Sequence, residues 1–236
     1  MAKRYLITDF GAITEASDNT AAIQSAIDTC FLAGGGEVVI PAGVFLTGDI
    51  RLRSHVTLYL KAGAVLRGIR DPLAYYHYQS DTVEPLPPAW YAGNTPEMTE
   101  KQDFHGGKIP PGCRWCHGLI RAIHAEDVAI VGEAGAIIDG DDCYDAIGEE
   151  YYRGPHAISM EDCKNIHLSG YTVKNSANWA HAIFHSENIH MRNVTVRAGH
   201  DGVHFTTCRN MTVEDCAFYT GDDCVAGLDL VNVHVK

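Results

Sequence analysis

The chain has 236 residues, of which 46% are hydrophobic, and it carries a formal net charge of −12 at pH 7. The acidic balance argues against a nucleic-acid partner, because affinity for nucleic acids depends on cations that neutralise phosphates. No apolar run reaches the roughly 18 residues of a membrane-spanning helix, so no membrane partner is expected. The first residues contain no apolar signal core. We therefore expect a cytoplasmic protein, or a secreted one if a leader has been removed.

Residues 1–36 predict a strand followed by a short amphipathic helix. Asp18, Asn19 and Thr20 are residue types that cap helix N-termini, and apolar residues then recur at helical spacing until the glycines at 34–36. Short runs of β-branched residues, separated by Gly and Pro, follow between residues 38 and 66 and predict short strands. In a chain dominated by strands, the helix is expected to cap the open apolar end of their stack.

Residues 70–118 break this pattern with Tyr, Trp, Pro and Gly, and an aperiodic segment of this length predicts a long loop insertion. Its aromatic rings either stack on sugar rings or pack the loop against the strands, and the sequence favours neither. Cys113, Cys116 and His117 match the attachment pattern of c-type haem, but neither an export signal nor an axial partner accompanies them. No second Cys pair stands at zinc-ligand spacing. We therefore expect a loop here, with no cofactor and no metal, and reduced cysteines throughout.

Residues 119–236 form the most regular part of the chain. Asn165, Asn188, Asn210 and Asn232 each open a short alternating strand, and they follow one another at steps of 22 or 23 residues. Short strands at such a period are typical of a parallel β-solenoid, in which each coil stacks on the one before. We expect a single domain over residues 1–236, with the asparagines forming an internal ladder at one corner.

Three aspartates occupy one point of this repeat. Asp201 lies 13 residues after its coil's asparagine and Asp223 lies 13 after the next, with Asp222 beside it. Stacked coils are about 4.8 Å apart, so these carboxylates should project from the same point of neighbouring coils. Their mutual repulsion should keep at least one of them protonated near neutrality, and such a set can supply both an acid and a base. A solvated turn would explain a lone Asp pair, but the third Asp in register favours a catalytic site.

Two further charged stretches precede the regular coils. Asp139, Asp141 and Asp142, with Asp145 and two glutamates close behind, make a second acidic cluster. Without a partner in register, we interpret it as a solvated turn. Arg153 could hold an anionic sugar, although an ordinary surface arginine is the simpler interpretation.

Several motifs, in this order and spacing, resemble glycoside hydrolase family 28, the polygalacturonases. The resemblance covers essentially the whole chain. Its first motifs are Asp-Phe-Gly-Ala at 9–12 and Pro-Ala-Gly-Val-Phe-Leu-Thr-Gly at 41–48, and the segment at 175–179 is similar to the family's Asn-Ser-Pro-x-Trp. Asp201 and Gly202 match the family's first catalytic Asp-Gly. Residues 221–226 are nearly the family's Gly-Asp-Asp-Cys-Ile-Ala.

The resemblance implies a single-stranded, right-handed parallel β-helix that hydrolyses a pectin-type bond, in galacturonan or rhamnogalacturonan, with inversion. Asp222 would be the general acid, and Asp201 and Asp223 the bases that activate water. Inverting glycosidases generally separate acid and base carboxyls by about 6.5–9.5 Å, which one coil step with a sideways offset could supply. The substrate-binding residues expected around them are His200, His204, Asn178, Arg153 and His156.

The sequence also departs from the family pattern. Gly199 and His200 replace the usual Asn and Thr, and His204 stands where an Asp is usual. The Gly-His-Gly and Arg-x-Lys motifs of later coils are absent. The chain is therefore expected to lack C-terminal coils, or to complete its helix in an assembly such as a homo-oligomer. Two other functions stay open: a β-helix that binds carbohydrate without cleaving it, and a calcium-dependent polysaccharide lyase that uses the three aspartates as ligands.

Overall fold

The structure is a computed structural model that describes residues 3–75, 118–146 and 148–236. Most of the expected loop insertion falls outside these ranges, including its aromatic residues beyond Tyr75 and the Cys113, Cys116 and His117 motif. A short 3-10 helix, η2 (Pro72–Ala74), lies at its beginning. In the described ranges, no helix is long and apolar enough to cross a membrane.

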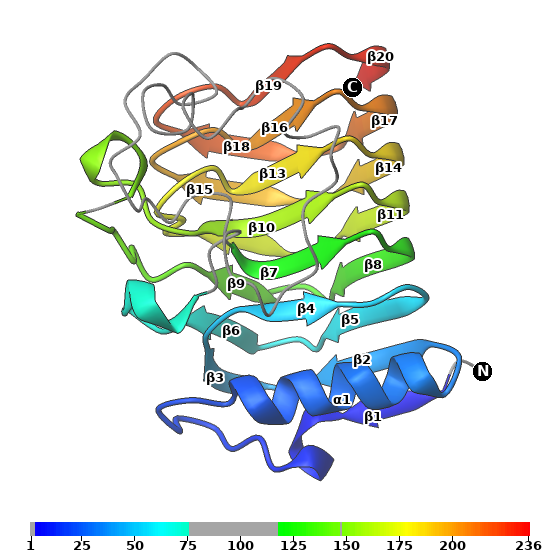
Figure 1. Cartoon of the computed structure of the whole chain (residues 1–236), viewed down its shortest axis with the longest axis vertical. Helices are drawn as coiled ribbons and strands as arrows, with labels where there is room; N and C mark the ends of the chain where they lie inside the picture. Colours follow the sequence, from blue (N-terminus) through cyan, green and yellow to red (C-terminus); the bar gives the residue numbers. More distant parts are fainter. Residues whose placement is uncertain (1–2, 76–117, 147) are drawn as a thin grey trace, which may run out of the picture.

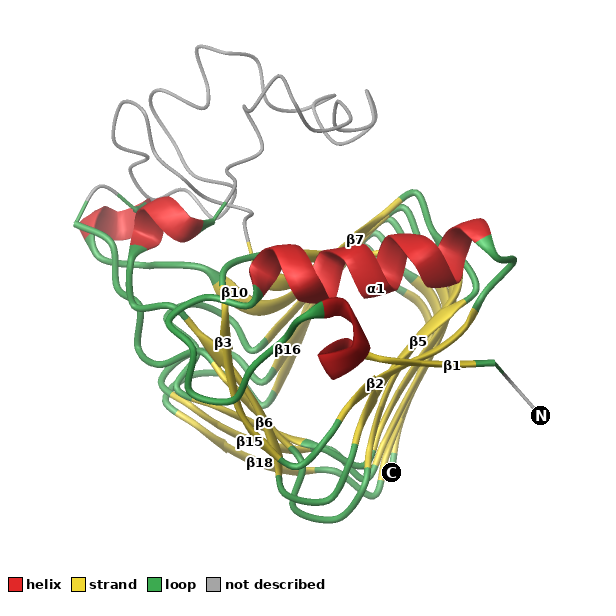
Figure 2. Ribbon diagram, turned by 90° about the horizontal axis from the view of Figure 1, so that it is seen from below, coloured by secondary structure: helices red, strands yellow, loops and turns green. Residues whose placement is uncertain are grey.

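The described strands form three parallel sheets, which make the faces of a tube (Figures 1 and 2). Sheet A contains β1 (Arg4–Leu6), β2 (Gly36–Ile40), β5 (Val56–Leu60), β8 (Glu126–Gly132), β11 (Lys164–Ser169), β14 (Glu187–Arg192), β17 (Arg209–Glu214) and β20 (Val231–Val235). Sheet B contains β3 (Gly43–Thr47), β6 (Ala64–Gly68), β9 (Ile137–Asp139), β12 (Thr172–Lys174), β15 (Thr195–Ala198) and β18 (Ala217–Thr220). Sheet C contains β4 (Ile50–Leu52), β7 (Gly118–Ile123), β10 (His156–Glu161), β13 (His181–Phe184), β16 (Val203–Thr206) and β19 (Val225–Leu228).

Each coil passes through sheets A, B and C in turn and stacks on the previous coil with matching residues opposite one another. Ile166 pairs with Ile189 and Ile189 with Met211, so one apolar column runs up the inside of sheet A. These side chains are buried because alternate residues of each strand point into the tube. The predicted all-β parallel β-helix is confirmed.

Helix α1 (Thr20–Leu32) lies across the first coil, as Figure 2 shows. It buries Ile23, Ala26 and Ile27 against the end of the tube, which is the capping role predicted for it. Asn19 precedes the helix but does not cap it with its side chain. Its amide instead accepts a hydrogen bond from the Ile13 N–H at 2.7 Å, and it therefore holds the preceding loop. Two single-turn 3-10 helices, η1 (Ile7–Phe10) and η3 (Glu149–Tyr151), lie in loops.

The asparagine ladder exists, but it is external and not internal as expected. Each amide nitrogen donates to the amide oxygen one coil below, from Asn232 down through Asn210, Asn188 and Asn165 at 2.9–3.0 Å, and Asp127 accepts the last bond. All of these side chains are exposed. Each residue has a left-handed backbone with φ of 54–60°, a conformation that Asn and Asp tolerate better than most residues. The period therefore predicted the stacking, whereas the left-handed kink turns the column outward.

Candidate active site

The three aspartates lie at the B–C corner of the helix, where each sheet B strand turns into a sheet C strand. Asp201 lies between β15 and β16, and Asp222 and Asp223 lie between β18 and β19, one coil further on. The Gly202 N–H donates to the Asp223 carbonyl at 2.8 Å, which joins the two turns. One oxygen of each carboxylate lies within 4.8 Å of the others, and only Asp201 is buried. The structure thus brings the three together as expected. Their oxygens are closer than about 6.5–9.5 Å, the separation that inverting glycosidases generally keep between the acid and base carboxyls.

A buried polar network holds the turn that carries Asp201. His181 Nδ1 lies 2.9 Å from the Gly202 carbonyl, and His181 Nε2 lies 3.0 Å from the Tyr171 hydroxyl. Burial lowers the pKa of His181 to about 4, so the ring is neutral at pH 7. A carbonyl only accepts, so Nδ1 carries the proton and Nε2 accepts from Tyr171. Gly202 is required here, because a Cβ would collide with the Phe218 ring.

A second histidine contacts Asp201 directly from the outer face of sheet C. His204 Nδ1 lies 2.9 Å from Asp201 Oδ2. The His204 ring is stacked on Trp179, with 3.9 Å between centroids and 7° between planes. His156 stacks on the same indole at 5.3 Å. Of the residues expected to bind substrate, His204 therefore touches a carboxylate of the cluster, and His156 lies behind Trp179.

Arg153, Asn178 and His200 form a second group beside the cluster. The Arg153 guanidinium donates to Asn178 Oδ1 at 3.2 Å and to Glu150 Oε2 at 2.8 Å. Its side chain is only 13% exposed, so it is not an ordinary surface arginine. Burial, together with the positive charge of Arg153, lowers the pKa of His200, and its imidazole is neutral at pH 7.

Two exposed tyrosines next to this group were not predicted from the sequence. The Tyr152 ring lies 5.8 Å from His200, and Tyr144 lies 6.3 Å from Tyr152. Both rings are about half exposed, at 42% and 48%. Aromatic rings with one accessible face are common in ligand sites. Their signal was local: aromatic residues clustered shortly before a regular coil.

The second acidic cluster is only partly a solvated turn: Asp142 is exposed, but the interpretation was wrong for Asp139 and Asp145, which are buried. Asp139 is 1% exposed and contacts Arg67 Nε and Lys174 Nζ, each at 3.1 Å. Burial raises its pKa, but hydrogen bonds from Asn175 and the Asp141 N–H, with Lys174, outweigh burial and leave the pKa below its ordinary value. Asp139 therefore links neighbouring coils through charges of opposite sign.

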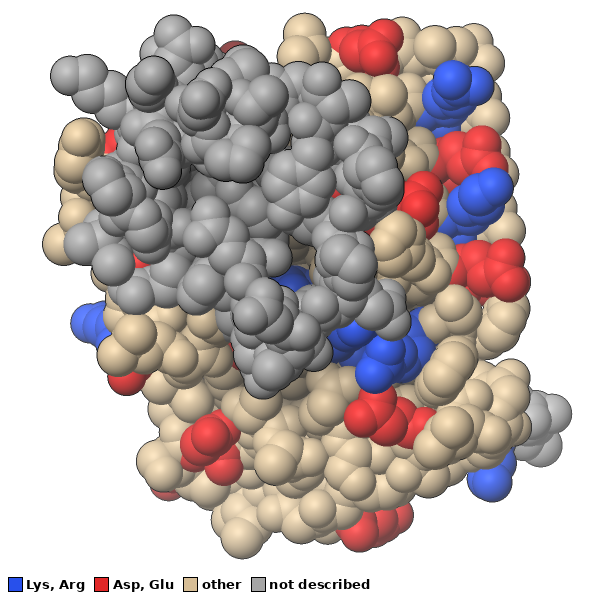
Figure 3. Space-filling model, in the orientation of Figure 1, with Lys and Arg blue, Asp and Glu red and all other residues tan. Residues whose placement is uncertain are grey.

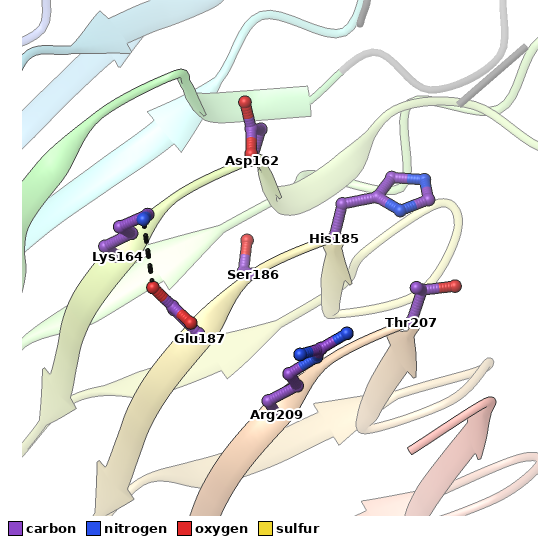
Figure 4. Close-up of a pocket in the computed structure, with 7 residues that line it drawn as sticks. All are labelled: Asp162, Lys164, His185, Ser186, Glu187, Thr207 and Arg209. Carbon is purple, nitrogen blue, oxygen red and sulfur yellow. Dashed lines mark ion pairs between the residues drawn. The ribbon is translucent and has the colours of Figure 1, made fainter. Parts of the chain in front are cut away.

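A pocket of about 260 Å³ lies at the C–A corner, where sheet C strands lead into sheet A strands. Figure 4 shows side chains of both signs around it, with Lys164 and Glu187 paired at 3.0 Å. The lining residues are Asp162, Lys164, His185, Ser186, Glu187, Thr207 and Arg209. None of the sequence-predicted site residues lines this pocket.

Comparison with known proteins adds to this geometry. The model of the family described as "Glycosyl hydrolases family 28" matches residues 112–236. A "Probable polygalacturonase" of Vitis vinifera is 30% identical over 93% of this chain and 43% of that protein. An "Exo-poly-alpha-D-galacturonosidase" of Dickeya chrysanthemi is 28% identical over 93% of this chain and 41% of that protein. The chain therefore spans less than half the length of these relatives. The crystal structure of an exopolygalacturonase from Thermotoga maritima has the same fold, with a TM-score of 0.71 at 24% identity, and covers 95% of this chain and 54% of that one.

Proposed function

Because the chain belongs to family 28 of the glycosyl hydrolases, we propose that the protein hydrolyses a glycosidic bond of a pectin-type polysaccharide, a galacturonan or rhamnogalacturonan. The substrate class follows the relatives, whose names describe polygalacturonases and an exo-acting galacturonosidase. The observation that carries the proposal is the cluster of Asp201, Asp222 and Asp223.

The proposed roles are those that the resemblance to the family implies. Asp222 is the acid that protonates the leaving oxygen of the substrate, and Asp201 and Asp223 are the bases that activate the attacking water. One water fits between two of these carboxylates. Two O–H···O bonds of about 2.7 Å each span up to about 5.4 Å, which exceeds the 4.8 Å between the oxygens. A water held by two acceptors attacks the anomeric carbon directly and inverts its configuration.

The group beside the cluster suits an acidic sugar. Arg153 supplies a fixed cation that can donate to a carboxylate, although Glu150 already neutralises part of its charge. Tyr152 and Tyr144 supply exposed aromatic faces for the sugar ring. We assign this group to recognition of the uronic acid, next to the bond that is cleaved.

The test is hydrolysis by the protein from its complete reading frame. Reducing ends should be released from a pectic oligomer, and Asp222→Asn should reduce the rate by at least about 100-fold, because proton transfer by a positioned side chain contributes about 10²–10⁴-fold. Asp229→Asn is the matched control. It makes the same change on the same coil, at an exposed turn with φ of 56° that Asn tolerates.

Three results would contradict the proposal. Release of no reducing ends from any uronic or neutral plant glycan would exclude hydrolysis. Binding without turnover, unchanged by the substitution, would indicate a carbohydrate-binding helix. An unsaturated, calcium-dependent product would indicate a lyase, since carboxylate oxygens are also calcium ligands.

A further inference from the structure

We propose that His204 is a positioning residue: it holds the Asp201 carboxylate in the orientation in which it accepts a proton from water, and Trp179 holds His204. The inference rests on the proposed hydrolase function and deepens it. It also changes the role expected for His204 from the sequence, which was to bind substrate.

The three carboxylates of the cluster are held differently. Asp201 accepts the His204 Nδ1–H bond at 2.9 Å, and both side chains are less than 10% exposed. An ionised carboxylate only accepts, so Nδ1 is the donor. Within the described residues, no hydrogen bond or ion pair reaches the side chains of Asp222 and Asp223, which are exposed. Only one of the three is therefore fixed before substrate arrives.

The His204 side chain itself has little conformational freedom. Its ring lies flat on the Trp179 indole at 3.9 Å. Trp179 precedes β13 and is anchored through its backbone: its N–H donates to Asn178 Oδ1 at 2.9 Å, and its carbonyl accepts from Ser176 Oγ at 3.0 Å. The orientation of Asp201 is thus fixed by the coil before it.

The backbone next to the Asp201 carboxylate is also held in place. His181 fixes the Gly202 carbonyl from inside the tube, while His204 fixes the Asp201 side chain from outside. The turn is held on both faces, which leaves a base whose position does not depend on bound substrate. Pre-organisation of this kind acts on kcat more than on KM, because it contributes equally to free and bound enzyme.

The test compares two amides at position 204 of the complete protein. In His204→Asn the amide nitrogen takes the place of Nδ1 and can still donate to Asp201. In His204→Gln the nitrogen lies further out, near the place of Nε2. We expect His204→Gln to lower kcat on the order of 100-fold with KM nearly unchanged, and His204→Asn to retain kcat within about tenfold of wild type. Trp179→Leu should lower kcat to an intermediate extent.

The matched control is His190→Asn. His190 contacts the Glu214 carboxylate through Nε2 at 2.8 Å, on sheet A and away from the cluster. The shorter amide of Asn cannot reach the place of Nε2, so this variant removes an imidazole–carboxylate bond elsewhere and should leave kcat unchanged. Thermal unfolding of each variant shows whether it is folded.

The outcomes separate the two proposals. A wild-type protein without turnover would overturn the proposed function. An active wild type in which His204→Gln and His204→Asn lose equal activity would overturn positioning by the Nδ1 donor. A rise in KM at constant kcat would return His204 to substrate binding.

Discussion

Two corners of the same coil stack their side chains in opposite ways. At the C–A corner, neighbours complement one another: asparagine amides donate and accept in a column, and Glu126, Lys164, Glu187 and Arg209 alternate in sign along paired strands. Figure 3 shows acidic and basic side chains alternating along one edge of this face. At the B–C corner, three carboxylates of the same sign lie within 4.8 Å. A repeat can pair its stacked side chains with partners of opposite charge, and the corner that instead stacks like charges is the one to which we assign the proposed hydrolysis.

The largest expected effect comes from removing one charge at the B–C corner. Asp223→Ala should lower the hydrolysis rate by at least about 100-fold, since it removes a proposed base. It should not lower the urea midpoint of unfolding, because it relieves repulsion between like charges. Initial rates and urea titrations measure the two. A variant that loses both activity and stability would mean that the cluster supports the fold.

Glu161, the last residue of β10, is an exception to the complementary pairing at the C–A corner, because its neighbour is also acidic. It is 5% exposed and lies next to Asp162, and burial first, then the charge of Asp162, raises its pKa to about 8 from an ordinary 4.5. The native state thus keeps a proton that the unfolded chain loses, so stability falls as pH rises from about 4.5 to about 8. This loss should amount to a few kcal/mol.

Glu161→Gln should remove that loss. Urea midpoints at pH 5, 7 and 9 should fall with pH in the wild type and change less in the variant. Glu187→Gln is the control, since the Glu187 side chain is 38% exposed and paired with Lys164, and it should keep the wild-type slope. An unchanged slope in Glu161→Gln would show that Glu161 is ionised in the native protein.

The smallest effect is expected in the asparagine ladder. Asn188→Ala removes two amide hydrogen bonds and places alanine at φ of 58°, so it should cost about 1–2 kcal/mol. Asn188→Gly removes the same bonds without the backbone strain and should cost less. Both should keep wild-type hydrolysis rates. Loss of activity without loss of stability would couple the two corners and remove the contrast between them.

The sequence predicted the features that depend on the repeat period, such as the stacking of the coils. It did not predict the features that depend on the direction of individual side chains. A step of 22 or 23 residues aligned Asp201 with Asp223 and identified the solenoid, and apolar residues at helical spacing identified its capping helix. It did not reveal that the asparagines face outward, because their left-handed backbone is a local feature. The polar pair of Tyr171 and His181 inside the tube also went unrecognised, since both positions match an apolar pattern only in part.

The interpretation of the second acidic cluster as a solvated turn was wrong at Asp139 for a related reason. Asp139 has its partners at Arg67 and Lys174, on the neighbouring coils. No short motif connects these residues in the sequence. Register between coils was needed to see that they meet, and the aperiodic segment between residues 70 and 118 hid that register.

The anomeric configuration of the first product tests the account most directly. Proton NMR during hydrolysis of a pectic oligomer by the complete protein shows which anomer forms before mutarotation. A water held between two carboxylates predicts inversion of the cleaved bond. Retention would contradict the proposal. It would mean that one of the closely spaced aspartates attacks the sugar as a nucleophile, as in retaining glycosidases, whose two carboxyls are about 5–5.5 Å apart.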